Sequence, residues 1–262
     1  MTIRQFSQMT RRAFLSMVGV SALGAALPNL ISSAENIPFR VPPTLMFHTK
    51  DRWKMPRILA WLRDEGYESV GYADLLKALE GKSALPEKPV IITIDDIASN
   101  YIQPYFLAMA DEMEKVGYRG VFGVVTRHSP ARSPKVWAQL RELVERSWEL
   151  DTHTTHHSLL PSLSMADLRE EIVESAQWIA EGTGRAPLTL IAPYGAVYRR
   201  GREFDPRIFE VAAEANLAFV VGIVGGRFIS AESSAPHYVG RVGIGTDHVQ
   251  TAWWIEHFHR ES

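Results

Sequence analysis

The chain has 262 residues, of which 46% are apolar, 22% charged and 10% aromatic, with a formal net charge of -2. This composition is typical of a globular protein and excludes an intrinsically disordered chain. The near balance of 28 basic and 30 acidic residues predicts no nucleic-acid partner, because nucleic-acid-binding domains usually carry a basic excess. Since there is no cysteine, disulfides, thiolate metal sites and a cysteine nucleophile are excluded.

Residues 1–34 have the pattern of an export signal. Three arginines and no acid occur in the first 12 residues, and an uncharged apolar stretch follows to about residue 31. This stretch is short for a membrane span, and the small residues Ser32-Ser33-Ala34 offer a cleavage site. The run Thr10–Leu15, which contains Arg11 and Arg12, resembles the twin-arginine signal that exports folded proteins.

The signal predicts how the chain is organised and where it works. We expect a twin-arginine signal peptide over residues 1–34 and one domain over residues 35–262. The mature protein is expected to be periplasmic or secreted, without stable membrane insertion after cleavage. An uncleaved N-terminal membrane anchor is the alternative.

From residue 44 onward, short apolar runs rich in β-branched residues alternate with segments of helical periodicity. The expected strands are 44–48, 90–94, 120–126, 148–151, 188–192 and 218–224. The expected helices are 53–65, 72–79, 102–116, 134–146, 166–181, 205–215 and 249–259. Such alternation predicts a parallel α/β fold, and about seven strands favour an open or distorted barrel over a doubly wound sheet. Either fold places its chemistry at the carboxyl ends of the strands.

Two adjacent acids, Asp95 and Asp96, directly follow the apolar run Val90–Ile94. Neighbouring side chains of a regular strand point to opposite faces, but both carboxylates can reach one site where the chain turns at a strand end. Two close carboxylates repel each other, so one of them usually binds a cation or a proton. The alternative is a helix-capping acid beside a solvated one.

Three of the nine histidines lie within five residues, just after the expected strand 148–151. His153 and His157 have the i,i+4 spacing that places two side chains on one face of a helical turn, where they can share a metal. His156 would also be within reach of His153. A polar loop with solvated histidines is the alternative.

A third strand end carries the run Ala192-Pro193-Tyr194-Gly195. Proline and glycine favour a tight turn there, and a turn can direct a backbone N–H at an oxyanion. Most segments of this kind are plain loops, so the run predicts little by itself.

Taken in this order, the acid pair, the histidine cluster and the Pro-Tyr-Gly turn resemble the polysaccharide deacetylase family. Three further runs share the likeness: Leu45–His48, Leu62–Tyr67 and Lys88–Asp96. The resemblance covers about residues 40–225 and is strongest to the branch that acts on poly-N-acetylglucosamine. It implies a distorted (β/α)7-type parallel barrel and a divalent metal, often zinc, with cobalt or nickel as alternatives.

The resemblance also implies an activity, a substrate and site residues. The activity would be metal-dependent removal of N-acetyl groups from an extracytoplasmic polysaccharide, such as poly-N-acetylglucosamine, a chitin-like chain or peptidoglycan glycan. The metal ligands would be Asp96, His153 and His157. Asp95 would be the general base, and the backbone N–H of Tyr194 would stabilise the oxyanion. Thr154 would contact the substrate or support the ligands, and Pro193 and Tyr194 would line the substrate site.

The chain departs from the family pattern in three places. Ile97 stands where glycine is usual, and its branched side chain is expected to narrow the turn and the groove. The third motif lacks the arginine that normally orients the base, so Asp95 is expected to lack that partner. The general acid is left open among His48, which ends the first expected strand, His237 and His248.

Three alternatives remain beside the deacetylase. The first is hydrolysis of another carbon–nitrogen amide bond on the same fold, and the second is a non-catalytic carbohydrate-binding module on a decayed fold. The third is a non-haem iron oxygenase, which also uses two histidines and one carboxylate, although the cluster has no His-x-Asp or His-x-Glu pair. Seven tryptophans could stack on sugars, but core packing is expected for most of them.

Overall fold

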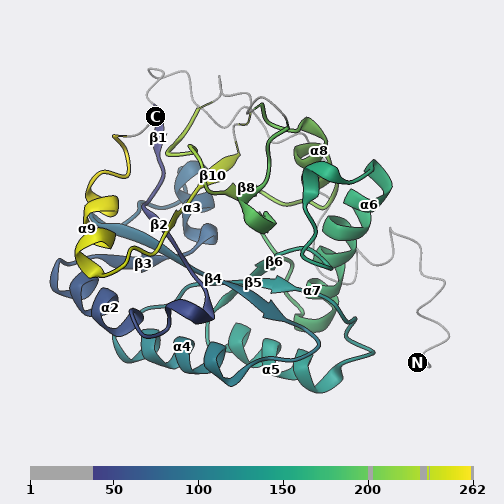
Figure 1. The fold of residues 1–262 in the computed structure, drawn as a ribbon, viewed down its shortest axis with the longest axis horizontal. Helices are drawn as coiled ribbons and strands as arrows, with labels where there is room; N and C mark the ends of the chain where they lie inside the picture. Colours follow the sequence, from purple (N-terminus) through teal and green to yellow (C-terminus); the bar gives the residue numbers. More distant parts are fainter. Residues whose placement is uncertain (1–37, 200–202, 231–234, 236, 261–262) are drawn as a thin grey trace. The chain divides into compact units, whose positions relative to one another are not determined.

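Eight parallel strands form a nearly closed barrel in the computed structural model, which describes residues 38–199, 203–230, 235 and 237–260 (Figure 1). Their spatial order is β10-β8-β7-β6-β5-β4-β2-β11, and the short strand β3 pairs with β4 beside this path. The strands are β2 (Thr44–Phe47), β3 (Glu68–Val70), β4 (Pro89–Ala98), β5 (Val121–Val125), β6 (Glu149–Thr152), β7 (Thr189–Ile191), β8 (Phe219–Gly222), β10 (Tyr238–Gly240) and β11 (Val242–Gly243). A separate two-stranded sheet pairs β1 (Phe39–Arg40) with β9 (Phe228–Ile229).

Arg241 joins the two ends of the barrel sheet. Strands β10 and β11 lie at opposite ends of the strand order, yet only this residue separates them in the chain. Its backbone N–H donates to the carbonyl of Gly222 at 3.0 Å. If β10 and β11 are counted as one bent strand, the eight strands of the barrel become seven. The predicted distorted (β/α)7-type parallel barrel is therefore confirmed. We call this junction, Tyr238–Gly243, the seam.

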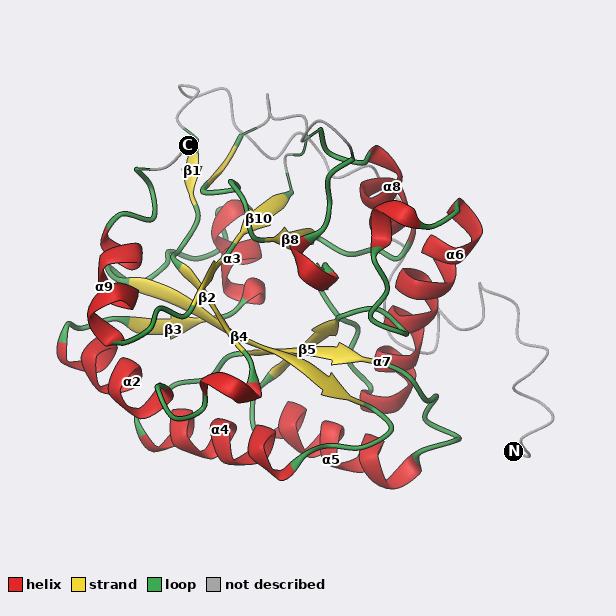
Figure 2. Cartoon of the chain, viewed as in Figure 1, coloured by secondary structure: helices red, strands yellow, loops and turns green. Residues whose placement is uncertain are grey.

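Helices connect the strands and surround the sheet (Figure 2). They are α2 (Met55–Asp64), α3 (Tyr72–Leu79), α4 (Pro104–Lys115), α5 (Pro134–Glu145), α6 (Met165–Arg169), α7 (Ser175–Thr183), α8 (Pro206–Glu214) and α9 (His248–Glu256). The helix expected over 166–181 is interrupted by a π-helical turn at Glu170–Glu174. Ser164 caps α6, because its hydroxyl accepts from the backbone N–H of Asp167 at 3.2 Å.

Apolar burial explains why these elements pack where they do. Strand β4 carries a run of β-branched residues, and Val90–Ile94 are all buried in it, as expected for a strand covered on both faces. Trp137 and Trp148 lie in the core, as predicted. Trp53 and Trp253 are exceptions, at 70% and 48% exposed.

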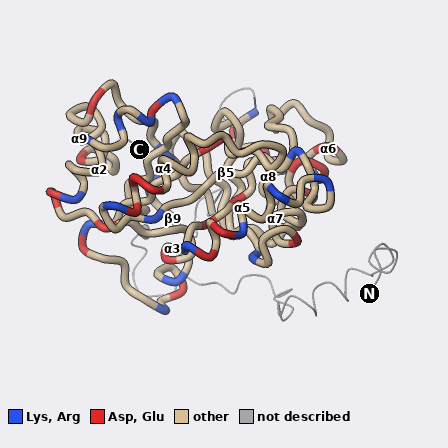
Figure 3. The backbone as a smooth tube through the Cα atoms, turned by 90° about the horizontal axis from the view of Figure 1, so that it is seen from below, with Lys and Arg blue, Asp and Glu red and all other residues tan. Residues whose placement is uncertain are grey.

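The outer surface of the described domain carries both signs of charge. Figure 3 shows basic and acidic residues interspersed along the helices. No helix within the described ranges is long and apolar enough to span a membrane. The predicted signal peptide, residues 1–34, lies outside the described residues.

Candidate active site

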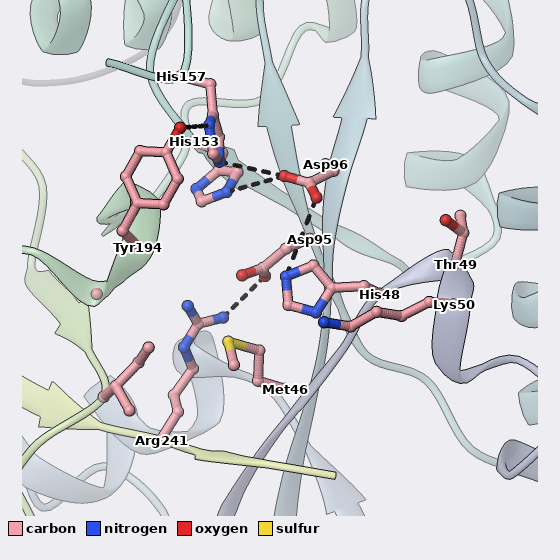
Figure 4. A pocket seen from close by; sticks show the side chains of 12 residues that line it. Met46, His48, Thr49, Lys50, Asp95, Asp96, His153, His157, Tyr194 and Arg241 are labelled. Atoms are coloured by element: carbon pink, nitrogen blue, oxygen red, sulfur yellow. Dashed lines mark hydrogen bonds and ion pairs between the residues drawn. The ribbon is translucent and has the colours of Figure 1, made fainter. Parts of the chain in front are cut away.

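A pocket of about 380 Å³ opens at the carboxyl ends of the barrel strands. It is lined by Met46, His48, Thr49, Lys50, Asp95, Asp96, His153, His157, Tyr194, Gly195, Ile223 and Arg241. Met46 lies on β2, Asp95 and Asp96 lie on β4, and Arg241 lies in the seam. The other lining residues lie in the segments that follow β2, β6, β7 and β8. The three strand ends singled out from the sequence therefore contribute to one site (Figure 4).

A β-bulge in β4 brings both acids into the pocket. Its pairing with β5 steps from Ile94–Phe122 to Ile97–Val124, so three steps along β4 match two along β5. Asp96 has a φ of 70°, and the extra residue breaks the alternation of side chains. Strand β4 thus continues to Ala98, and a bulge inside the strand replaces the strand end that we expected at this point.

Asp96, His153 and His157 form a candidate metal site, with ligand atoms all within 4.8 Å of one another. Asp96 Oδ1 lies 3.4 Å from Nε2 of His153 and 3.3 Å from Nε2 of His157. Burial favours the neutral acid, but hydrogen bonds from the two imidazoles hold the pKa of Asp96 well below its ordinary value. Asp96 is therefore a carboxylate, the form that binds metal.

The hydrogen bond on the far side of His153 prepares this ring as a ligand. Its Nδ1 lies 2.7 Å from the carbonyl oxygen of Ile191. Because a carbonyl only accepts, Nδ1 is assigned a proton, and a cation bound at Nε2 would replace the proton that Nε2 shares with Asp96. Two imidazoles and one carboxylate fit a divalent metal and leave positions for water and substrate.

The histidine segment is a loop and not the helical turn that its spacing predicted. Thr154 and His157 have φ values of 68° and 64°. The hydroxyl of Thr154 accepts from the backbone N–H of His157 at 3.0 Å, and the rings of His153 and His157 lie 4.7 Å apart. Thr154 is fully buried, so of the two roles expected for it, the structure favours support of a ligand over contact with substrate.

The π-helical turn at Glu170–Glu174 braces this loop through its main chain. A π turn widens the helix and changes its hydrogen-bond pattern. Here the carbonyl of Glu170 accepts from the hydroxyl of Thr155 at 3.1 Å, and the carbonyl of Glu171 accepts from the backbone N–H of Thr155 at 3.1 Å. The interruption of the helix therefore serves the loop that carries the histidines.

The side chain of Glu171 braces the same loop and turns His156 away from the candidate metal site. Its carboxylate accepts from the backbone N–H of His156 at 2.8 Å and from the hydroxyl of Ser158 at 2.7 Å. It also lies 3.0 Å from Nδ1 of the His156 ring. Burial opposes ionisation of Glu171, but these donors lower its pKa below the ordinary value. His157 is thus the histidine placed beside His153.

Asp95 pairs with Arg241, so an arginine of the seam takes the place of the one that the third motif lacks. Arg241 Nη1 donates to Asp95 Oδ1 at 2.8 Å and to Thr93 Oγ1 at 2.9 Å, and both charged side chains are almost fully buried. Burial alone would raise the pKa of Asp95, but the charges of Arg241 and His153 lower it. Asp95 is therefore an ionised, oriented carboxylate that can accept a proton.

Tyr194 lies on a left-handed turn beside the histidines. It has a φ of 60°, and Gly195 follows with a φ of 63°. A Cβ at Gly195 would lie 2.5 Å from Ile223, so this position requires glycine. The Tyr194 side chain is 66% exposed, and its hydroxyl is 3.3 Å from Nδ1 of His157. Pro193 begins the turn and is buried.

His48 is the one of the three general-acid candidates that lines the pocket. Its Nε2 lies 4.0 Å from Asp96 Oδ2, and its Nδ1 lies 3.8 Å from Asp51 Oδ2. The ring therefore sits between two carboxylates. His237 precedes β10, where burial lowers its pKa, and His248 begins α9, so neither belongs to the pocket wall.

Ile97 does not narrow the groove. Its side chain is fully buried and belongs to the main core cluster with Ile102 and Phe106. Because the bulge at Asp96 shifts the register, the residue after the acid pair points into the core and not into the pocket. The expectation of a narrowed groove is wrong for this reason.

Residues 82–220, more than half of the chain, match the family model for polysaccharide deacetylase. Together with the barrel and its pocket, this match shows that the chain belongs to the polysaccharide deacetylase family. A comparison with curated protein sequences gives no match.

Solved structures share the fold. The Streptococcus pyogenes deacetylase PplD in complex with acetate has a TM-score of 0.66 at 18% identity, over 83% of this chain and 98% of that one. The deacetylase domain of BpsB from Bordetella bronchiseptica has a TM-score of 0.61 at 20% identity, over 82% and 98%. IcaB from Ammonifex degensii has a TM-score of 0.65 at 21% identity, over 85% and 100%. At these identities the likeness establishes a common fold.

Proposed function

We propose that this protein is a metal-dependent hydrolase that removes N-acetyl groups from an extracytoplasmic glycan. Poly-N-acetylglucosamine, a chitin-like chain and peptidoglycan glycan are the candidate substrates. Membership of the family supports a carbohydrate deacetylase. The observation that carries the finer proposal is the contrast between the adjacent acids: Asp95 faces a buried arginine, and Asp96 faces two imidazoles.

This contrast gives the two acids different tasks. Asp96, His153 and His157 would hold a divalent cation, with zinc as the first candidate and cobalt or nickel as others. Such a cation supplies a Lewis acid for the amide carbonyl. Asp95, held by Arg241 at 2.8 Å, is left free of ligand duty and takes the proton of the attacking water.

The remaining residues complete the hydrolysis. The water oxygen forms a bond to the acetyl carbon while Asp95 accepts its proton. The backbone N–H of Tyr194 donates to the oxyanion that develops on the carbonyl oxygen. His48, whose Nε2 faces Asp96 at 4.0 Å, then gives a proton to the nitrogen as the C–N bond breaks. The products are acetate and a free amine on the sugar.

The proposed location follows from the N-terminal segment. The twin-arginine pattern within residues 1–34 supports export by that route, to the periplasm or beyond the cell. Glycans of the cell envelope are accessible there, which fits the proposed substrates.

The test is acetate release from N-acetylated oligosaccharides by zinc-loaded protein, compared with Asp95→Asn. We expect about one metal per chain in both proteins, and a fall of about 10³-fold in kcat/KM in Asp95→Asn, because a general base contributes about that much. Metal content by mass spectrometry and acetate by a coupled assay give the two readouts. Turnover close to wild type in Asp95→Asn would refute the base assignment, and no acetate from any such glycan would refute the reaction.

A further inference from the structure

Most of the large exposed apolar side chains lie on segments that follow the barrel strands. Within the described residues, the large exposed apolar side chains are Trp53, Tyr101, Tyr105, Leu159, Tyr194, Val224, Val249 and Trp253. All but the last two follow the barrel strands β2, β4, β6, β7 and β8, at the end where the pocket opens. Exposed apolar side chains at the end where the pocket opens are candidates for binding substrate.

Arg52 ties two of these rings together. Its guanidinium carbon lies 3.5 Å from the ring centroid of Trp53 and 4.4 Å from that of Tyr105. Its Nη1 also donates to the carbonyl of Thr49 at 2.9 Å. We call Arg52, Trp53 and Tyr105 the aromatic platform. The rings are still 70% and 49% exposed, so the arginine packs on part of each ring and leaves the rest accessible.

The aromatic platform is continuous with the pocket. Thr49, which accepts from Arg52, lines the pocket together with Lys50. Arg52 and Trp53 follow β2, and Tyr105 follows β4. These two strands are parallel neighbours, with Phe47 paired to Ile94, so the segments that follow them start side by side. Figure 4 shows Thr49 and Lys50 on one side of Asp96 and Tyr194 on the other. The candidate metal site therefore lies between Tyr194 and Thr49, the residue that contacts Arg52 of the platform.

We propose that the aromatic platform binds the sugar unit next to the one whose acetyl group is removed, and so holds the glycan chain across the pocket. The position of the reacting sugar rests on the proposed function. A pyranose ring has an apolar C–H face that packs on an exposed aromatic ring, and hydroxyl groups that accept from a guanidinium. The platform offers both partners already in place, which lowers the cost of ordering them on binding.

The test measures how affinity depends on chain length. N-acetylglucosamine oligomers of one to four units, linked β-1,4 or β-1,6, are titrated calorimetrically into zinc-loaded Asp95→Asn, in which we expect turnover to be about 10³-fold slower. The same titration is made with Trp53→Ala added, and with Trp253→Ala added as a matched control. Trp253 is also half-exposed and stacks on a neighbour, His257 at 4.4 Å, but it lies on α9. If the wild type releases no acetate, it replaces Asp95→Asn as the parent.

We expect the tetramer to bind about tenfold more tightly than the monomer, and Trp53→Ala to remove most of this gain, as for loss of one anchoring ring. Trp253→Ala should change tetramer affinity by less than about twofold, as for an ordinary surface substitution. Equal affinity for all lengths, or a gain that survives Trp53→Ala, would overturn the proposal. Length-dependent binding through Trp53 without acetate release would keep the subsite and refute the deacetylation. Acetate release without length dependence would do the reverse.

Discussion

The two walls of the pocket are built from the sequence in different ways. One wall, with Asp96, His153 and His157, is the proposed metal site, and we call it the metal wall; Asp95, the proposed base, and Arg241 form the base wall. On the metal wall, His153 and His157 lie four positions apart and are set by a loop whose hydrogen bonds mostly stay within its own segment and the next helix. On the base wall, Asp95 and Arg241 are 146 positions apart. Arg241 reaches Asp95 because the seam joins the two ends of the barrel sheet.

The walls also differ in solvation. The side chain of Asp96 is 48% exposed, whereas those of Asp95 and Arg241 are 2% and 1% exposed. A half-exposed carboxylate can lose its histidines at little cost to the fold, but a buried charge that loses its partner is strongly destabilising. The difference predicts that damage to the metal wall changes metal binding first, whereas damage to the base wall also changes stability and pH dependence.

The largest expected effect separates the two neighbouring histidines of the metal wall. His157→Ala should abolish binding of zinc, and turnover should fall by about 10³-fold or more, because the Lewis acid is lost. His156→Ala should retain about one zinc per chain, since His156 faces Glu171. Metal content and the thermal midpoint of the metal-free proteins are the measurements. Zinc kept in His157→Ala and lost in His156→Ala would show that His156, and not His157, binds the metal with His153.

On the base wall, Arg241→Gln should lower kcat/KM and stability together. We expect a loss of about 3–5 kcal/mol in the free energy of unfolding, because Asp95 becomes a buried charge without its partner. The arginine lowers the pKa of Asp95, so its removal raises that pKa. The base is active when ionised, and the acidic limb of the pH profile of kcat/KM should therefore move to higher pH.

Arg241→Lys is the matched variant for this experiment. It keeps a positive charge near Asp95 but replaces the planar guanidinium, whose Nη1 donates to both Asp95 and Thr93, with a more flexible ammonium. Its acidic limb should lie between those of the wild type and Arg241→Gln, and it supplies the pH profile if Arg241→Gln does not fold. An acidic limb unchanged in both variants would contradict a role for Arg241 in setting the protonation of Asp95.

The sequence predicted the metal wall better than the base wall for a physical reason. Strand and helix periodicity located the segments, and the spacing of His153 and His157 indicated a shared site although the loop is not helical. Arg241 sits in a glycine-rich segment with two very short strands, where no periodicity is readable. Its contact with Asp95 depends on how the barrel closes, which no local spacing records.

The bulge in β4 could not be predicted from the sequence for a related reason. Two adjacent acids indicated a site, but whether they turn at a strand end or at a bulge depends on pairing with β5. The π-helical turn at Glu170–Glu174 likewise follows from contacts with the histidine loop, while the helical pattern of its own residues continues through it. Tertiary contacts decided both irregularities, and both serve the pocket.

The smallest expected effect tests whether the metal wall depends on support from outside its own loop. Glu171→Gln keeps the size of the side chain but replaces one acceptor oxygen with a donor, which cannot satisfy the donors of His156 and Ser158 together. We expect zinc affinity to fall by about tenfold, as for partners that orient metal ligands, measured by competition with a chelator. Glu174→Gln, on the same π-helical turn, should leave the affinity unchanged within about twofold. Equal affinities in the two variants would show that the contacts of Thr155 with the carbonyls of Glu170 and Glu171 hold the loop without the carboxylate.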